Sequence, residues 1–236
     1  MSGAVAWHDL ECGGYGEDLA LWQQLAAAPS LPDGPILDVG AGTGRVALDL
    51  ARAGHEVVAL DADPELLTAL EQRASSLPVT TVVADARDFA LGRRFRLILV
   101  PMQTVQLLEG RHGELLVCAA AHLARGGILA VTLANPPAYD GDVRPLPDIH
   151  ERDGWVWASQ AVALRSRPSG LEIERLRELV SPTGERTVSG DVVTLVRIDA
   201  DELEAQGRDA GLTPLPRQTI DESDDYAGSD VVIFRA

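Results

Sequence analysis

The sequence predicts an α/β protein built on a doubly wound, mostly parallel sheet. Short apolar runs alternate with segments of helical periodicity over the first two thirds of the chain, and a glycine-rich turn joins the first run to the first helix. Parallel strands need long crossover connections, and helices are the usual crossovers. The length of 236 residues and the apolar content of 46% are sufficient for one large core.

The predicted strands are short apolar runs that end at a glycine, an acid or a proline. Ile36–Val39 is followed by glycines, and Phe95–Val100 is stopped by Pro101. Short apolar runs between such breakers are typical of buried strands. On this basis we expect strands at residues 36–39, 56–60, 80–84, 95–100, 127–133 and 230–235.

The helices between these strands are predicted from apolar residues that recur on one face. In the segment 45–53, Val46 and Leu50 share a face. Pro64 suits the first turn of a helix over residues 64–74. The same reasoning predicts helices at residues 17–28, 113–125 and 201–210.

The pattern changes after about residue 140. The stretches 154–166, 171–179 and 188–198 have the composition of strands and are joined by turns rich in proline, glycine and serine. Because no helix separates them, they predict an antiparallel β insertion between the fifth strand and the last helix. Trp155 and Trp157 alternate along the first of these strands, so their side chains share one face.

Composition excludes some classes of partner. The formal net charge is -16, and all twenty basic residues are arginine, with no basic block. Binding to a nucleic acid backbone or an anionic membrane surface requires clustered positive charge, so neither partner is expected. The two cysteines form no metal-ligand pattern, and no apolar run of about 18 residues is present. We expect a cytoplasmic protein without a metal; composition does not determine its oligomeric state.

The stretch ILDVGAGTGRVA is the most informative part of the chain. Gly40, Gly42 and Gly44 permit positive φ angles and close approach of a ligand to the backbone. The loop leads into the N-terminus of a helix, whose free N–H groups and dipole attract polar or anionic groups. This junction therefore predicts a cofactor-binding loop.

Three acids lie at the ends of three successive strands, where ligands bind in doubly wound sheets. Asp38 lies at the mouth of the first strand, where its carboxylate can meet a cationic amine. Asp61 can accept hydrogen bonds from both hydroxyls of a ribose, and Asp85 can accept one from the exocyclic amine of adenine. Together they favour a ligand that joins adenosine to an ammonium group.

A dinucleotide cofactor is the alternative on the glycine loop alone. A GxGxxA pattern is present at Gly42, Gly44 and Ala47, and Asp61 suits the ribose of either cofactor. An NAD(P)-dependent oxidoreductase is therefore one alternative hypothesis for the function. A non-catalytic protein that binds S-adenosylmethionine is the other alternative.

These motifs resemble those of class I S-adenosylmethionine-dependent methyltransferases. The resemblance covers roughly residues 15–135 and 200–236 and implies a seven-stranded, Rossmann-like sheet with S-adenosyl-L-methionine as the cofactor. The insertion is similar to that of the small-molecule branch, which includes sugar N-methyltransferases. The resemblance implies that these residues bind the cofactor: Asp38, Gly40, Ala41, Gly42, Gly44, Asp61, Ala62, Asp85, Ala86 and Pro101. Met102 and Gln103 are implied to face the methionine end and the acceptor.

The expected reaction transfers a methyl group to a nitrogen or oxygen atom of a small-molecule metabolite. Such an in-line displacement needs a general base only if the acceptor must lose a proton early, as a hydroxyl does. Residues 31–140 and 199–236 are expected to form the cofactor-binding core, residues 1–30 a lid helix region, and residues 141–198 a cap on the acceptor side. The candidate acceptor-side residues are His150, the first choice of base, and Tyr15, Gln103 and Tyr139.

Overall fold

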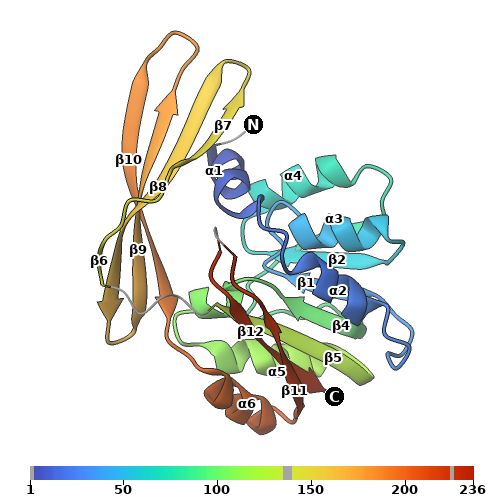
Figure 1. Cartoon of the computed structure of the whole chain (residues 1–236). Coiled ribbons are helices and arrows are strands. Elements are labelled where there is room, and N and C mark those ends of the chain that lie inside the picture. Colours follow the sequence, from blue (N-terminus) through green and yellow to red (C-terminus); the bar gives the residue numbers. More distant parts are fainter. Residues whose placement is uncertain (1–2, 135–139, 224–225) are drawn as a thin grey trace. The chain divides into compact units, whose positions relative to one another are not determined.

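A computed structural model describes residues 3–134, 140–223 and 226–236 of the chain (Figure 1). The chain divides into two compact units. The first, which we call the core unit, comprises Tyr15–Asn135 and Ile198–Ala236. The second, the insertion unit, comprises Met1–Gly14 and Pro136–Arg197. The division between residues 14 and 15 separates the first helix from the second, although both lie in the segment 1–30.

The core unit contains a seven-stranded sheet with the strand order β11-β12-β5-β4-β1-β2-β3. Strands β1 to β5 pair in parallel, whereas β12 is antiparallel to both β5 and β11. This sheet confirms the predicted fold class. The strands are β1 (Ile36–Val39), β2 (Val57–Asp61), β3 (Val79–Val83), β4 (Phe95–Val100), β5 (Leu123–Ala134), β11 (Thr213–Ile220) and β12 (Ser229–Arg235).

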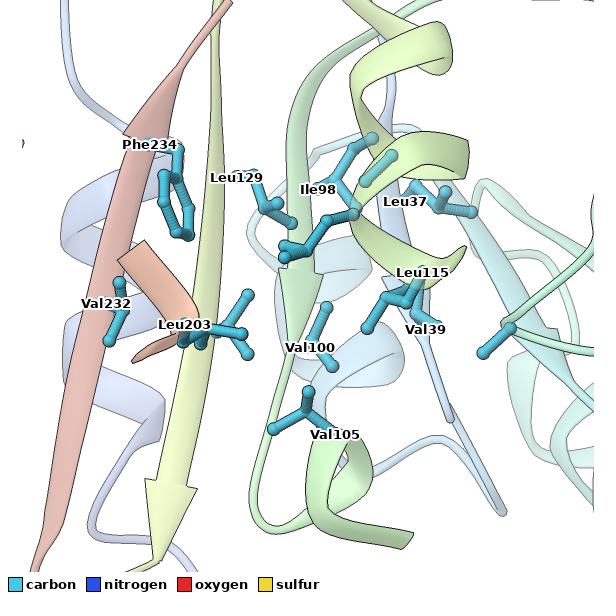
Figure 2. Close-up of a cluster of buried hydrophobic side chains, with 14 of the residues drawn as sticks. Leu37, Val39, Ile98, Val100, Val105, Leu115, Leu129, Leu203, Val232 and Phe234 are labelled. Carbon is cyan, nitrogen blue, oxygen red and sulfur yellow. The ribbon is translucent and has the colours of Figure 1, made fainter. Parts of the chain in front are cut away.

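Helices cover both faces of this sheet, because alternate residues of each buried strand point to opposite sides. Leu37 and Ile98 join the apolar cluster under α5 (His112–His122) and α6 (Ala200–Asp209), which Figure 2 shows in close-up. Their neighbours Ile36 and Leu97 join the cluster on the other face. The helices on that face are α2 (Leu19–Ala26), α3 (Arg45–Arg52) and α4 (Pro64–Ala74) (Figure 1).

Most element boundaries of the core unit lie within two residues of the prediction, and two larger differences occur. The fifth helix ends at His122, and β5 begins at once with Leu123, whose backbone is extended. Leu123 is buried in the strand, and an apolar residue at this position also suits the buried face of the predicted helix, so its side chain gave no sign of the change. No range had been predicted for β11, which contains Pro214 and Pro216. It lies at the edge of the sheet, where strands tolerate proline.

The insertion unit is an antiparallel sheet, as predicted, with the order β10-β9-β8-β6 and with β7 paired to β8. Two strands and one helix of this unit were not predicted: β6, β7 and α1. The elements are α1 (Gly3–Cys12), β6 (Gly141–Asp142), β7 (Asp148–Arg152), β8 (Trp155–Arg167), β9 (Gly170–Val180) and β10 (Arg186–Val196).

A partly buried ion pair attaches α1 to this sheet. Arg177 of β9 donates to both carboxylate oxygens of Glu11 at 2.7 Å, and the Ser159 hydroxyl donates to the same carboxylate at 2.7 Å. The Arg177 guanidinium also lies 5.5 Å from the ring centre of Trp7. Burial alone would raise the pKa of Glu11, but the hydrogen bonds from Arg177 and Ser159 lower it below its ordinary value. Polar contacts thus hold a helix in which only Val5 and Ala6 are buried.

Glu11→Ala should lower the free energy of unfolding by about 2–3 kcal/mol, because it leaves the Arg177 guanidinium without its main partner. Equilibrium urea denaturation measures this change. Glu178→Ala removes the exposed partner of Arg186 in the same sheet and serves as the control, with a smaller expected effect. Equal losses in the two variants would show that the Glu11 pair contributes no more than a surface pair.

Candidate functional site

The strand order reverses between β1 and β4, and this switch point fixes where a ligand can bind. From β1 the chain proceeds to β2 and β3 on one side, whereas β4 and β5 lie on the other. Connections that depart in opposite directions leave a crevice beyond the carboxyl ends of the two central strands. The glycine loop, residues 40–44, follows β1, and the segment 101–104 follows β4.

All three glycines of the loop adopt positive φ angles, which glycine permits. The values are 74° for Gly40, 53° for Gly42 and 96° for Gly44. A side chain at Gly40 would place its Cβ 2.6 Å from Thr104, and one at Gly44 would lie 2.0 Å from Leu70. Packing within the protein therefore already requires glycine at positions 40 and 44.

Asp61 anchors the glycine loop to the end of β2. The Gly42 N–H donates to one carboxylate oxygen of Asp61 at 2.7 Å, and the Asp63 N–H donates to the other at 2.9 Å. Each carboxylate oxygen accepts about two hydrogen bonds, so both retain capacity for a further donor. Two free acceptor positions on one carboxylate match a pair of vicinal hydroxyls.

Asp38 is buried beside the glycine loop with 1% of its surface exposed. Neither of its carboxylate oxygens has a hydrogen-bond partner within the residues that the structure describes. Burial raises the pKa of Asp38 to about 7; Arg45 and the nearby backbone N–H of Ala47 oppose this shift, and Asp18 and Asp61 add to it. A buried acceptor without a donor is costly, and a ligand ammonium group at this position would remove that cost. The site therefore fits a cationic amine.

Arg45 does not neutralise Asp38, because it is paired with another acid. Its guanidinium donates to both oxygens of the fully buried Asp18, at 2.5 and 2.8 Å, and to the Tyr15 carbonyl at 3.1 Å. It also lies 5.0 Å from the ring centre of Tyr15, which makes an edge contact with Tyr226 at 4.9 Å. These contacts fix residues 15–18 to the first turn of α3, next to the glycine loop.

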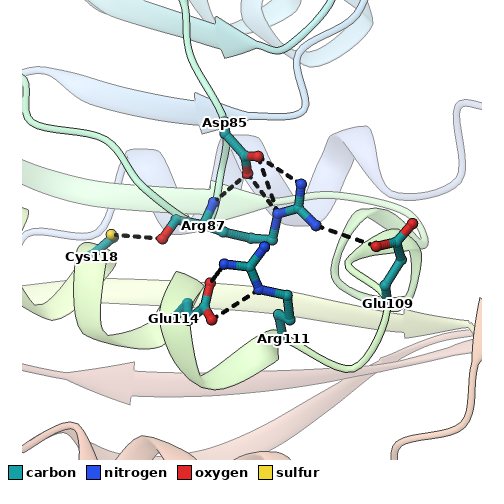
Figure 3. A network of polar contacts seen from close by, with 6 residues as sticks. All are labelled: Asp85, Arg87, Glu109, Arg111, Glu114 and Cys118. Carbon is teal, nitrogen blue, oxygen red and sulfur yellow. Dashed lines mark hydrogen bonds and ion pairs between the residues drawn. The ribbon is translucent and has the colours of Figure 1, made fainter.

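Asp85 follows β3 and is held by Arg87, as Figure 3 shows. The Arg87 guanidinium donates to both oxygens of Asp85, and its backbone N–H donates to one of them at 2.8 Å. The side-chain hydrogen bonds from Arg87 are the main reason that the pKa of Asp85 falls to about 2. The neighbouring Ala86 is buried in the core, whereas Ala62 after β2 is exposed.

The loop after β4 combines a buried residue with a strained one. Pro101 is buried, and Met102 has a φ of 54°, which is unusual for a residue with a side chain. Gln103 precedes the short helix η1 (Thr104–Leu107) and is half-buried. The side chain of Gln106 accepts from the Ala134 N–H at 2.8 Å and donates to the Ala134 carbonyl, which ties η1 to the end of β5. Nothing in the sequence pattern indicated this role for Gln106.

The acceptor-side candidates fall in different parts of the chain. Tyr15 is buried in the core unit, and burial, with Asp18 next in weight, raises its pKa to about 12. Its phenol is therefore protonated at neutral pH. His150 lies on β7 of the insertion unit, with its ring centre 6.3 Å from that of Trp157. Tyr139 lies outside the described residues. The roles predicted for Tyr15, Gln103 and His150 stay predictions.

The predicted face of β8 is confirmed, since the ring centres of Trp155 and Trp157 are 6.2 Å apart. His150 pairs with Trp157 across the β7–β8 ladder, so the three rings form a row on one face. Among the described residues, no group of three or more histidine, cysteine or acidic side chains is arranged to hold a metal ion. Within the same residues, no helix has the length and apolar character that a membrane crossing requires.

Comparison with known proteins finds a similarity within the core unit. Residues 36–127 match the family model described as a methyltransferase domain. They comprise the glycine loop, the three strand-end acids and the segment that follows β4. This part of the chain is therefore similar to a methyltransferase domain, in agreement with the resemblance that the sequence motifs indicate.

Two relatives share 30% sequence identity with this chain. The first is a cypemycin N-terminal methyltransferase of Streptomyces sp, which aligns over 150 residues, or 61% of this chain and 60% of the relative. The second is a tRNA1(Val) (adenine(37)-N6)-methyltransferase of Klebsiella pneumoniae (strain 342), aligned over 52% of this chain and 58% of the relative. The chain thus spans about three fifths of the length of these relatives.

A solved structure shares the whole fold. It is that of S-adenosylmethionine-bound CalS10, an amino pentose methyltransferase from Micromonospora echinaspora, with a TM-score of 0.75. The similarity covers 100% of this chain and 98% of CalS10, at 20% sequence identity. Since both units are included in the alignment, the insertion belongs to the shared fold.

Stability should depend on pH through Asp38. In the folded chain its pKa is about 7, against an ordinary value of 3.8, so the folded state holds one more proton than the unfolded state between these values. The free energy of unfolding therefore falls as pH rises from about 4 to about 7 and then levels off. Asp38→Asn keeps the shape of the side chain but cannot titrate. Urea denaturation at pH 5, 6, 7 and 8 gives the free energy of unfolding of both proteins. The value for the wild type minus that for the variant should fall from pH 5 to about pH 7 and change little above it. Parallel pH profiles for the two proteins would contradict it.

Proposed function

We propose that this protein binds S-adenosylmethionine on the glycine loop and transfers its methyl group to a nitrogen atom of a small-molecule acceptor. One observation carries the proposal: Asp38, Asp61 and Asp85 lie at the carboxyl ends of three adjacent strands, and the loop that follows the first of these strands has three positive φ angles. The fold shared with S-adenosylmethionine-bound CalS10 supports the choice of cofactor. When bound, this cofactor supplies a methyl group that its sulfonium has already activated.

Each acid has a distinct proposed role in holding the cofactor. Asp38 accepts from the ammonium group of the methionine part, because it is the buried acid without a partner among the described residues. Asp61 accepts from the two ribose hydroxyls while it holds the Gly42 N–H. Asp85 accepts from the exocyclic amine of adenine, beside Ala62 and Ala86. Pro101, Met102 and Gln103 are proposed to border the methionine end.

The preference for nitrogen rests on the ionisation of the site. A hydroxyl acceptor must lose a proton early, whereas a neutral amine attacks with its own lone pair. Tyr15 holds its proton at neutral pH, and the Gln103 amide cannot accept one as a base. Two relatives are named for methylation at nitrogen, one at an N-terminus and one at an adenine N6, and CalS10 acts on an amino pentose. His150 is retained as the proposed base for a hydroxyl acceptor.

A small acceptor is favoured over nucleic acid. One relative is named for a tRNA, but the present chain has a formal charge of -16 and contains no lysine. This charge repels a phosphate backbone. The insertion unit is proposed to form the acceptor-side cap, with the aromatic row of His150, Trp155 and Trp157 as a candidate contact surface. The segment that contains Tyr15 and α2 is proposed to act as a lid.

Cofactor and reaction are tested separately. Calorimetry should detect binding of S-adenosylhomocysteine and none of NAD; binding of NAD alone would overturn the proposal in favour of an oxidoreductase. Transfer of a labelled methyl group from S-adenosylmethionine should then be measured with paired small molecules that differ only in an amine or a hydroxyl. We expect label on the amines, and label confined to the hydroxyl compounds would contradict the preference for nitrogen.

Asp61→Ala should weaken the binding of S-adenosylhomocysteine by about 1–3 kcal/mol, because it removes charged acceptors for the ribose and releases the Gly42 N–H. Calorimetry at constant pH measures the change. Asp63→Ala is the matched control, since Asp63 caps α4 through the Glu65 N–H and makes no contact with the glycine loop that the structure describes. Unchanged affinity in Asp61→Ala would show that the ribose binds elsewhere.

A further inference from the structure

The side chain of Asp85 is fixed although much of it faces solvent. It is 44% exposed, and an isolated aspartate at such a position samples several rotamers. Here Arg87 Nε lies 2.9 and 3.1 Å from the two carboxylate oxygens, and Nη2 lies 2.7 Å from one of them. Together with the Arg87 backbone N–H at 2.8 Å, these contacts fix both the position and the plane of the carboxylate (Figure 3).

Arg87 is itself held from two further sides. Its Nη1 lies 3.6 Å from Glu109, which precedes α5, and its carbonyl accepts from the Cys118 thiol of α5 at 3.4 Å. Arg111, the neighbouring arginine in Figure 3, donates instead to Glu114. The guanidinium of Arg87 is therefore a fixed link between the end of β3 and the segment that leads into α5.

The number of donors defines what Asp85 can still accept. A carboxylate has about four acceptor positions. Three N–H groups of Arg87 use about three of them: its backbone N–H, Nε–H and one Nη2–H. About one position remains, which suits a single N–H donor. The carboxylate is ionised throughout the physiological range and so cannot donate a proton to a ligand carbonyl.

We propose that Arg87 is a positioning residue that holds Asp85 to accept one N–H from the 6-amino group of adenine, and that this pair sets the preference for adenine over a 6-oxo purine. The inference rests on the proposed function, which supplies the adenosine ligand. In a 6-oxo purine the carbonyl oxygen would face the ionised Asp85 carboxylate, and two hydrogen-bond acceptors at hydrogen-bonding distance repel each other. A fixed carboxylate strengthens this discrimination, because it cannot rotate away from the wrong base and loses little freedom when the right one binds.

The test compares two ligands by calorimetry: S-adenosylhomocysteine and its hypoxanthine analogue, in which a 6-oxo group replaces the 6-amino group. The wild type should prefer the adenine compound. Arg87→Met keeps the unbranched part of the side chain but removes its donors, and it should reduce this preference about threefold to tenfold. Arg87→Lys retains one charged donor and should restore part of the preference. Arg111→Met, which leaves the Asp85–Arg87 contacts intact, is the control and should keep the wild-type ratio.

The ratio of the two affinities separates positioning from a purely structural role. If Arg87 only stabilises the turn, its loss weakens both ligands by the same factor and leaves the ratio unchanged, which would overturn the inference. An unchanged affinity for both ligands would overturn it as well. Arg87→Gln is the second variant if Arg87→Met does not fold, as judged by circular dichroism. A wild type that binds neither ligand would instead refute the proposed function, and the inference with it.

Discussion

The balance of charge at the first turn of α3 is the constraint on which the candidate cofactor site depends. Arg45 stands at the positive end of a helix dipole, where a cation is unfavourable. The fully buried Asp18 compensates it through contacts at 2.5 and 2.8 Å. Because the Arg45 guanidinium donates its hydrogen bonds to Asp18, it does not donate to the nearby Asp38. Both carboxylate oxygens of Asp38 are without a hydrogen-bond partner among the described residues. The folded chain thus presents a buried carboxylate that a ligand cation would satisfy.

The glycine motif has more than one physical cause. The side chains of Thr104 and Leu70 occupy the space that a Cβ at Gly40 and Gly44 would need. The absence of side chains at these two positions therefore lets the loop pack closely against η1 and α4. Gly42 has a different role, since its N–H connects the loop to Asp61. Internal packing therefore shapes the loop before any ligand arrives. Such preorganisation lowers the cost of binding, because the backbone does not have to be ordered by the cofactor.

The sequence was sufficient to predict the parts of the structure that follow from local pattern. The strand-end acids could be placed because each follows an apolar run, and the carboxyl ends of parallel strands lie at one edge of a sheet. Contacts between distant residues left no such pattern. Arg45 and Asp18 are 27 residues apart, and Arg177 and Glu11 are 166 residues apart. Neither the isolation of Asp38 nor the attachment of α1 could therefore be derived from the sequence.

The same charges bear on how the proposed cofactor exchanges for its product. S-adenosylmethionine carries a sulfonium charge in addition to the ammonium and carboxylate of its methionine part, whereas S-adenosylhomocysteine lacks the sulfonium. Arg45 and Arg87 each form a bidentate contact with one acid, Asp18 and Asp85 respectively, and neither donates a hydrogen bond to Asp38. Under the proposed function, the formal charge of -16 would attract the cationic cofactor more strongly than its neutral product. Methyl transfer to an amine would move the positive charge from sulfur to the acceptor, so the step that completes the reaction would also weaken the hold on the spent cofactor.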